Sequence, residues 1–262
     1  MKSLLPLIGL ALLAGCTSGP PIDHRYASVS QDSRVHYVIL HYTGDDFPRS
    51  LENLTKGGVS SHYLITDHPA AIYQLVDEHQ RAYHAGISAW ENDTQLNYSS
   101  IGIELVNPGY QDTPQGRVFF GYAPEQIALL IDLLKQIVAR HQIAPEHILG
   151  HNEIAPQRKV DPGPLFPWRR LAQAGLIRWP AADQVTQRQQ TFEQQLSDIS
   201  WFQRKLLQYG YVFPCSGQWD EVTRNVLVAF QMKYRPSRFD GLPDAETAAL
   251  LDVITSEPFA NP

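Results

Sequence analysis

Short runs of β-branched and aromatic residues, separated by polar turns, fill the first half of the chain and constrain its fold most. Four of these runs are expected to be strands, at residues 35–42, 63–66, 72–76 and 101–106. Pro124 then opens an apolar stripe with three- and four-residue spacing, which predicts an amphipathic helix over 123–138. Residues 147–150 are long enough for a last strand. Strands on both sides of a long helix predict an α/β fold, with a mixed β-sheet flanked by helices.

The composition of the chain changes near residue 190. Residues 180–195 are polar, rich in Gln and poor in apolar side chains, which is typical of a linker. Three helical stretches are expected beyond it, at residues 199–209, 220–234 and 244–254. Asp220 and Asp244 are suited to accept hydrogen bonds from free amides where the last two begin. We therefore predict a large domain over 35–179 and a small three-helix domain over 196–262.

The amino terminus is similar to a bacterial lipoprotein signal. Lys2 precedes the apolar segment 4–13, which is too short to span a bilayer comfortably. The run Leu13-Ala14-Gly15-Cys16 resembles a lipobox, in which the cysteine becomes the lipidated first residue of the mature protein. The alternative is an ordinary signal peptide that happens to contain a cysteine. We predict that residues 1–16 hold the signal peptide and the lipidated Cys16, and that residues 17–34 are a tether.

Acyl chains on Cys16, at about 0.8 kcal/mol per buried methylene, would anchor the protein to a membrane durably. Thr17, and not Asp, follows the cysteine. By the sorting rule for such lipoproteins, this predicts the outer membrane of a Gram-negative bacterium, with the periplasm as the expected side. If Cys16 carries lipid, Cys215 has no intramolecular partner, and a disulfide framework is excluded.

Charge argues against nucleic acid as a partner. The formal charge is −6, and loss of Lys2 with the signal makes it −7 by subtraction. Proteins that bind phosphate backbones usually have a basic face or a strongly basic domain, whereas the Lys and Arg residues here are scattered among more numerous acids.

The segment 151–164 carries the strongest chemical signal. His151 and Asp161 lie at two ends of a loop whose backbone is stiffened by several prolines. A catalytic zinc typically takes three side-chain ligands and leaves a fourth position to water. His41, at the end of the apolar run 38–40, is the candidate for the third ligand. Each of the three, taken alone, could equally be structural in a chain with ten histidines.

The chain resembles a known enzyme family at several separate motifs. They are Val38 to Thr43, Ser60 to Leu64, His84 to Trp90, Ser100 to Glu104 and Ile154 to Trp168. These motifs are similar to those of the zinc-dependent N-acetylmuramoyl-L-alanine amidases, the family related to T7-type lysozyme and the peptidoglycan recognition proteins. Within it, the resemblance is strongest to the outer-membrane lipoprotein amidases of enteric bacteria. Residues 206–211, 228–231 and 240–247 resemble a peptidoglycan-binding type 1 domain, although a helical appendage that only packs on the catalytic domain would also fit.

The resemblance implies that residues 35–179 bind one Zn²⁺ through His41, His151 and Asp161. Most relatives have Cys in place of Asp161, but a carboxylate oxygen also satisfies tetrahedral zinc. Glu104 is the expected proton acceptor, since a carboxylate in an apolar strand is costly without a role or a partner. Its alternative is a structural ion pair with Lys159 or Arg158. Lys159, two residues before Asp161, is expected to stabilise the oxyanion unless it is only a solvated charge.

Two further residues are weaker candidates for substrate contact. His84 lies in the His-Ala-Gly motif and could contact substrate or the groups behind the metal ligands, or it could be a satisfied core histidine. Trp90 is the second of the pair, whereas His62 is expected to be structural.

These residues predict an enzyme that hydrolyses the amide bond between N-acetylmuramic acid and L-alanine in peptidoglycan or muropeptides, with anhydro-muramic acid as a further candidate. We expect a monomer held at the membrane by its lipid. The first alternative is a non-catalytic peptidoglycan-recognition lipoprotein, which needs neither zinc nor Glu104 for affinity. The second is a zinc peptidase that cuts within the stem peptide and releases a different amine.

Overall fold

The computed structural model describes residues 20 and 22–256, and these divide after Asp32 into two units. The described part of the first unit has neither helix nor strand and contains a local ion pair between Arg25 and Asp23. The predicted signal peptide and Cys16 lie outside the described residues.

A five-stranded sheet forms the centre of the second unit, in the order β3-β2-β4-β1-β7. Its strands are β1 (Tyr37–Tyr42), β2 (Tyr63–Ile65), β3 (Ile72–Gln74), β4 (Ser100–Leu105) and β7 (Ile148–Gly150). Neighbouring strands are parallel except β2 and β3, which are antiparallel. The predicted mixed sheet is therefore confirmed, and its strands lie at the five expected places.

Side-chain alternation along the strands gives the sheet two buried faces. Val38 and Leu40 of β1 and Ile103 of β4 enter one core, with apolar side chains of α3 (Pro124–His141) and α5 (Trp168–Gln173). Ile39 and the other odd-numbered residues of β1 point to the opposite face. Because β4 pairs in register with β1, Ser100, Gly102 and Glu104 share that opposite face.

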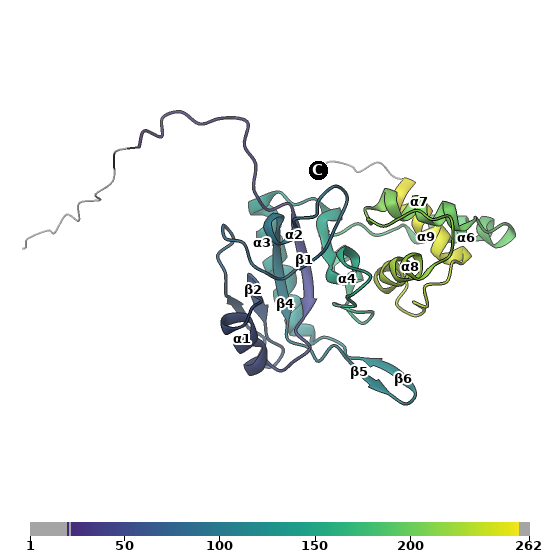
Figure 1. Cartoon of the computed structure of the whole chain (residues 1–262), viewed down its shortest axis with the longest axis horizontal. Helices are drawn as coiled ribbons and strands as arrows, with labels where there is room; N and C mark the ends of the chain where they lie inside the picture. The colour runs from purple at the N-terminus through teal and green to yellow at the C-terminus, as the bar shows by residue number, and fades with distance from the viewer. Residues whose placement is uncertain (1–19, 21, 257–262) are drawn as a thin grey trace, which may run out of the picture. The chain divides into compact units, whose positions relative to one another are not determined.

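The C-terminal helices cover this opposite face. They are α6 (Ala182–Gln194), α7 (Ile199–Tyr209), α8 (Glu221–Tyr234) and α9 (Ala245–Ser256). Phe202 and Phe230, both fully buried, belong to the same apolar cluster as Ile39 and Leu149 of the sheet. Figure 1 shows α4 (His151–Ile154) between the sheet and α8. The C-terminal helices therefore share a core with the sheet.

The three expected C-terminal helices are present, and the predicted caps hold. Asp220 accepts a hydrogen bond from the Thr223 amide, and Asp244 accepts one from the Thr247 amide. The segment 180–195, which we interpreted as a linker, instead contains α6, and Arg188 of this helix pairs with Asp252 of α9. Its polar composition reflects a solvent-facing helix, since α6 has no buried residue.

Several short elements were not predicted. They are α1 (Phe47–Lys56), α2 (Leu96–Ser99), the hairpin of β5 (Tyr110–Thr113) and β6 (Gly116–Phe119), the 3₁₀ turn η1 (Pro145–His147), and α4 and α5. The hairpin extends from the sheet in Figure 1. Its strands are mostly exposed, so they lack the apolar alternation by which the other strands were recognised.

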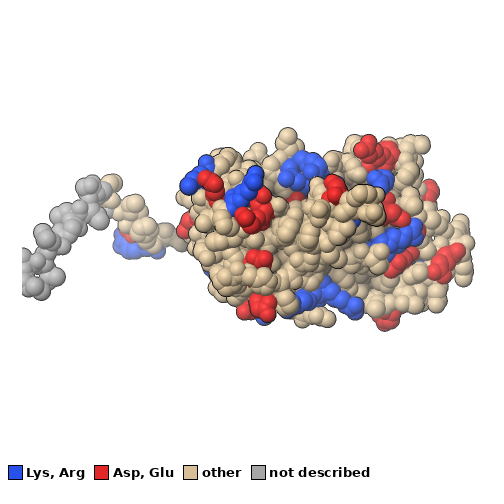
Figure 2. Space-filling view, turned by 90° about the horizontal axis from the view of Figure 1, so that it is seen from below, with Lys and Arg blue, Asp and Glu red and all other residues tan. Residues whose placement is uncertain are grey.

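Charge is mixed on the surface, and Lys and Arg alternate with Asp and Glu on the face that Figure 2 shows. In the part of the chain that the structure describes, no helix is both long and apolar enough to cross a bilayer.

Candidate active site

The candidate site lies where three parallel strands end. His41 is near the end of β1, Glu104 is its register partner on β4, and His151 follows β7 directly as the first residue of α4. The carboxyl ends of parallel strands meet at one edge of a sheet, which is a common place for ligands in α/β folds. Asp161 arrives on the loop after α4, where its carbonyl accepts a hydrogen bond from the Asn152 amide.

Three side chains converge at this edge. The Nδ1 atoms of His41 and His151 are 2.9 Å apart, and Oδ2 of Asp161 lies 3.1 and 3.0 Å from them, respectively. All three residues are buried. Within residues 20 and 22–256 they are the single group of three or more His, Cys, Asp or Glu side chains arranged to hold a metal ion.

Their protonation suits metal binding. Burial, followed by the neighbouring His151, lowers the pKa of His41 to about 4. Burial alone would raise the pKa of Asp161, but His151 and His41 hold it below its usual value. At neutral pH the site therefore presents a neutral imidazole at His41 and an ionised carboxylate at Asp161, the forms that bind metals.

The donor set fits zinc. Two imidazole nitrogens and one carboxylate oxygen are ordinary zinc ligands, and bonds of about 2.0–2.1 Å in a tetrahedron place ligand atoms roughly 3.3 Å apart. The observed separations of 2.9 to 3.1 Å are close to this value. Three electron-rich atoms this close repel one another, and a cation between them relieves that repulsion. The site opens into a cleft of about 570 Å³, which leaves a side for water and substrate.

Glu104 and Lys159 also line the cleft. The Oε2 atom of Glu104 is buried without a hydrogen-bond partner, so the structure gives no ion pair with Lys159 or Arg158 at that atom. Burial, followed by the charge of Asp161, raises the pKa of Glu104 to about 8. A carboxyl group with a buried oxygen that has no hydrogen-bond partner, beside a metal site, is suited to take up a proton.

His84 and Trp90, the two weaker candidates for substrate contact, have different surroundings, and His84 is the one that lines the cleft. His84 lies behind His41, with its Nδ1 3.0 Å from Nε2 of His41 and its Nε2 3.2 Å from Oγ of Ser100. Trp90 is 1% exposed and packs edge-on against Tyr209 and Tyr211 in the core shared with the C-terminal helices. Trp90 is thus not among the residues that line the cleft, and its contact with substrate stays a prediction.

Sequence reasoning missed the residues that hold His84. Its amide and that of Ala85 both donate to Oδ1 of Asn97, at 2.9 and 2.7 Å. Gly102 leaves room for the imidazole, since a Cβ there would lie 2.4 Å from Cγ of His84. A glycine inside a strand often marks such a close approach, and this was the available signal.

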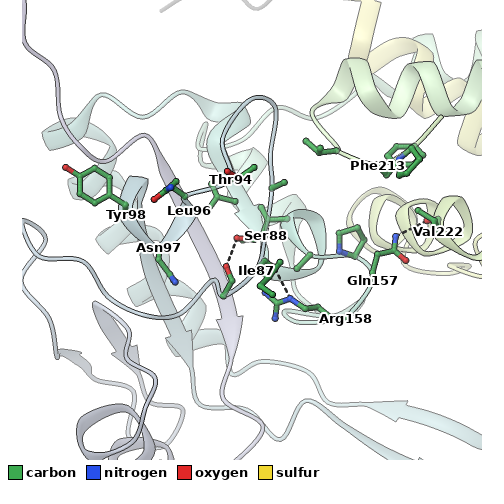
Figure 3. Close-up of a pocket in the computed structure, with 18 of the residues that line it drawn as sticks. Ile87, Ser88, Thr94, Leu96, Asn97, Tyr98, Gln157, Arg158, Phe213 and Val222 are labelled. Atoms are coloured by element: carbon green, nitrogen blue, oxygen red, sulfur yellow. Dashed lines mark hydrogen bonds between the residues drawn. The ribbon is translucent and has the colours of Figure 1, made fainter.

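A larger groove of about 820 Å³ adjoins the cleft, and Arg158 lines both (Figure 3). One wall comes from the loop around Ile87 and the other from the C-terminal part, including Phe213 and Val222. Among the described residues that line the groove there are two arginines, Arg81 and Arg158, and no carboxylate.

Known proteins match both parts of the chain. The Amidase_2 family model, described as N-acetylmuramoyl-L-alanine amidase, matches residues 31–164, and the PG_binding_1 model for a peptidoglycan binding domain matches residues 195–251. The N-acetylmuramoyl-L-alanine amidase AmiD of Escherichia coli (strain K12) is 41% identical over 97% of this chain and 98% of its own length.

Two solved structures are similar over most of the chain. The first is E. coli AmiD in complex with the substrate anhydro-N-acetylmuramic acid-L-Ala-D-γ-Glu-L-Lys, with a TM-score of 0.80 and 40% identity over 90% of this chain and 94% of that one. The second is AmpDh3 from Pseudomonas aeruginosa in complex with an anhydromuramic pentapeptide, with a TM-score of 0.83 and 37% identity over 89% and 96%.

Proposed function

Since this chain belongs to the N-acetylmuramoyl-L-alanine amidase family, we propose that it cleaves the bond between muramic acid and L-alanine with a zinc ion held by His41, His151 and Asp161. The observation that carries this proposal is the convergence of ligand atoms from three buried residues near Glu104, whose Oε2 has no hydrogen-bond partner.

Zinc, when bound, polarises the amide carbonyl and lowers the pKa of water toward about 7. The protein supplies the remaining steps. Glu104 accepts the proton of the attacking water and returns it to the leaving amine of L-alanine. Lys159 lies in the same cleft and places its ammonium toward the carbonyl oxygen as negative charge develops there.

The substrate class that we propose is anhydro-muropeptide. Both solved relatives were seen with such compounds, and the one bound to AmiD has D-γ-Glu, which carries a free carboxylate, after L-alanine. The larger groove suits that peptide, because it continues from the cleft and has two arginines and no carboxylate among its described lining residues. We place the carboxylates of the stem peptide near Arg81 and Arg158.

The remaining parts of the chain support a location at the cell wall. The lipobox-like Leu13-Ala14-Gly15-Cys16 supports a lipid anchor in the outer membrane, and residues 17–34 would then be the tether. The match of residues 195–251 supports binding of peptidoglycan by the C-terminal helices. Anchor and wall-binding domain together would raise the local concentration of the catalytic site on its polymer.

Digestion of purified peptidoglycan and anhydro-muropeptides by protein that begins at residue 17 tests the reaction. We expect peptides with a free L-alanine amino terminus, lost with a chelator and restored by Zn²⁺, as read by mass spectrometry. Binding without release would favour the non-catalytic alternative, and fragments cut within the stem peptide would favour the peptidase.

The variant Arg81→Gln tests whether the stem peptide binds in the groove. We expect a higher KM for an anhydro-muropeptide with free carboxylates and little change in kcat, because Arg81 lines the groove and not the cleft that holds the metal ligands. For the same peptide with amidated carboxylates, wild type and variant should behave alike. Equal KM values for the acidic substrate would contradict this placement of the peptide.

A further inference from the structure

We propose that Ser100, His84 and the Ala85 carbonyl fix the tautomers of both histidine ligands, and so aim both Nδ1 lone pairs at the metal. This inference rests on the zinc site of the proposed function. It assigns positioning roles to a strand residue and a loop that lie outside the ligand set.

The Ala85 carbonyl fixes the tautomer of His151 directly. Nε2 of His151 lies 3.1 Å from the carbonyl oxygen of Ala85. A carbonyl oxygen can only accept a hydrogen bond, so Nε2 must carry the hydrogen. A metal-bound imidazole is neutral and has one N–H, so with Nε2–H donating to Ala85 the lone pair on Nδ1 is left for the metal.

The tautomer of His41 depends on two further side chains, His84 and Ser100. The hydroxyl of Ser100 donates its one hydrogen to the carbonyl of Leu96, so Oγ must accept from Nε2 of His84. Neutral His84 then has a lone pair on Nδ1, which accepts from Nε2 of His41 at 3.0 Å. Nδ1 of His41 is again left free for the metal. Each series of hydrogen bonds ends on a main-chain carbonyl, at Ala85 for His151 and at Leu96 for His41. A carbonyl oxygen cannot donate, so the direction of each series is fixed.

Residues 84–87, which include His84 and the Ala85 carbonyl, are themselves held by hydrogen bonds. Oδ1 of Asn97 accepts from the amides of His84 and Ala85, and Nε of Arg158 donates to the Ile87 carbonyl at 2.8 Å (Figure 3). Arg158 also donates to the Ala85 carbonyl. Ligand histidines commonly donate their second N–H to a fixed acceptor, and loss of that acceptor typically weakens metal binding by about 10- to 100-fold.

The decisive variant is Ser100→Ala, with Ser61→Ala as its matched control. Both serines are fully buried, but Oγ of Ser61 has no hydrogen-bond partner. In Ser100→Ala the Nε2–H of His84 loses the oxygen that accepted from it, so the tautomer with the hydrogen on Nδ1 becomes more favourable. That hydrogen would be donated to Nε2 of His41, and the hydrogen of His41 would then lie on Nδ1, the atom that binds the metal. We expect the Zn²⁺ dissociation constant, measured by competition with a chromophoric chelator, to rise roughly tenfold in Ser100→Ala. The Zn²⁺ dissociation constant of Ser61→Ala should stay within about twofold of the wild-type value, because Ser61 makes no hydrogen bond to the histidines.

A spectroscopic readout separates positioning from packing. In ¹⁵N NMR of the zinc-free protein at neutral pH, we expect the Nε2–H form of His41 in wild type. In Ser100→Ala, His41 should shift to a mixture with Nδ1–H, whereas His151 should not change because its acceptor is untouched. Unchanged His41 nitrogen shifts in Ser100→Ala would overturn the inference, even if zinc affinity fell.

The outcomes also distinguish the inference from the proposed function. Wild-type protein that binds no Zn²⁺ would contradict the proposed metal chemistry, while the zinc-free NMR spectra would still decide the tautomers. Wild-type and Ser100→Ala proteins with equal Zn²⁺ affinity would leave the amidase intact and remove only the role of Ser100.

Discussion

Glu104 lies at the site with part of its carboxyl group withdrawn from water. It has a buried oxygen without a hydrogen-bond partner, and burial raises its pKa to about 8. A carboxyl group with that pKa is mostly protonated at neutral pH in the metal-free protein. A dication in the adjacent ligand set favours the ionised form and lowers this pKa, so metal binding prepares Glu104 to act as a base.

Replacement of this carboxylate should separate chemistry from metal binding. We expect Glu104→Gln to lower kcat by roughly 10²- to 10⁴-fold, the usual contribution of a general base. Zinc content should stay at the wild-type level, since Glu104 is not a ligand in the proposed set. Glu52→Gln, at an exposed position on α1, is the control and should keep full activity. Loss of zinc from Glu104→Gln would show that the carboxylate holds the metal.

The raised pKa of Glu104 also predicts how pH affects stability without metal. The folded protein holds this proton up to about pH 8, whereas a glutamate in the unfolded chain releases it near its ordinary pKa of 4.5. The folded state therefore binds more protons between these values, and its stability falls as pH rises through that window. Urea unfolding of chelator-treated protein at pH 5 and pH 8 should show a larger loss for wild type than for Glu104→Gln. An equal loss of stability in both proteins between pH 5 and pH 8 would show that a group other than Glu104 titrates in this range.

At the scale of elements, β4 carries more of the site than its sequence suggests. Ser100, Gly102 and Glu104 lie at alternate positions and share one face of the sheet. Ser100 accepts a hydrogen bond from His84, Gly102 leaves room for the His84 imidazole, and Glu104 provides the carboxylate. A helix or a loop would not give this spacing, because only a strand places every second residue on one face.

The space at Gly102 yields a prediction about the element. A methyl group in Gly102→Ala would lie 2.4 Å from Cγ of His84, so the imidazole must move away from His41. We expect weaker Zn²⁺ binding and a lower melting temperature. Gly121→Ala is the control, because a Cβ at that position meets nothing within 4 Å. Wild-type zinc affinity in Gly102→Ala would mean that His84 can shift without consequence for the ligands.

Elements with a strong apolar pattern were predictable, and those that depend on partners were not. The runs that became β1, β4 and β7 were recognisable, and so the ends that bring His41, Glu104 and His151 together could be anticipated. The network behind His41 could not, because Ser100 and His84 meet only through strand pairing and a loop fixed by Asn97.

Two helices, α1 and α6, were missed for different reasons. Asp46 and Pro48 at the start of α1 are cap residues that the sequence does contain. The polar composition of α6 matched a linker, and its packing on α9 depends on tertiary structure rather than on a local pattern.

At the scale of the whole molecule, the sheet and the C-terminal helices depend on each other. Lys233 of α8 contacts both carboxylate oxygens of Glu153 in α4 at 3.0 Å, and both side chains are buried. Glu153 in turn accepts from the Gly150 amide at 2.8 Å, next to the ligand His151. Removal of one partner from a buried ion pair typically costs about 3–5 kcal/mol, because a charge is left without compensation.

Deletion of residues 196–262 should therefore abolish folding as well as any affinity for the wall. It would uncover Ile39, Leu149 and Trp90, at roughly 1.5–3 kcal/mol each, and leave Glu153 without its cation. That sum is comparable with the whole stability of an ordinary domain, about 5–15 kcal/mol. Thermal unfolding followed by circular dichroism should show no cooperative transition for this deletion, whereas deletion of residues 17–32, which lie in the separate unit, should leave the transition unchanged. A protein ending at residue 195 that melts at the full-length temperature would show that the sheet needs no cover from these helices, and that wall binding is their one contribution.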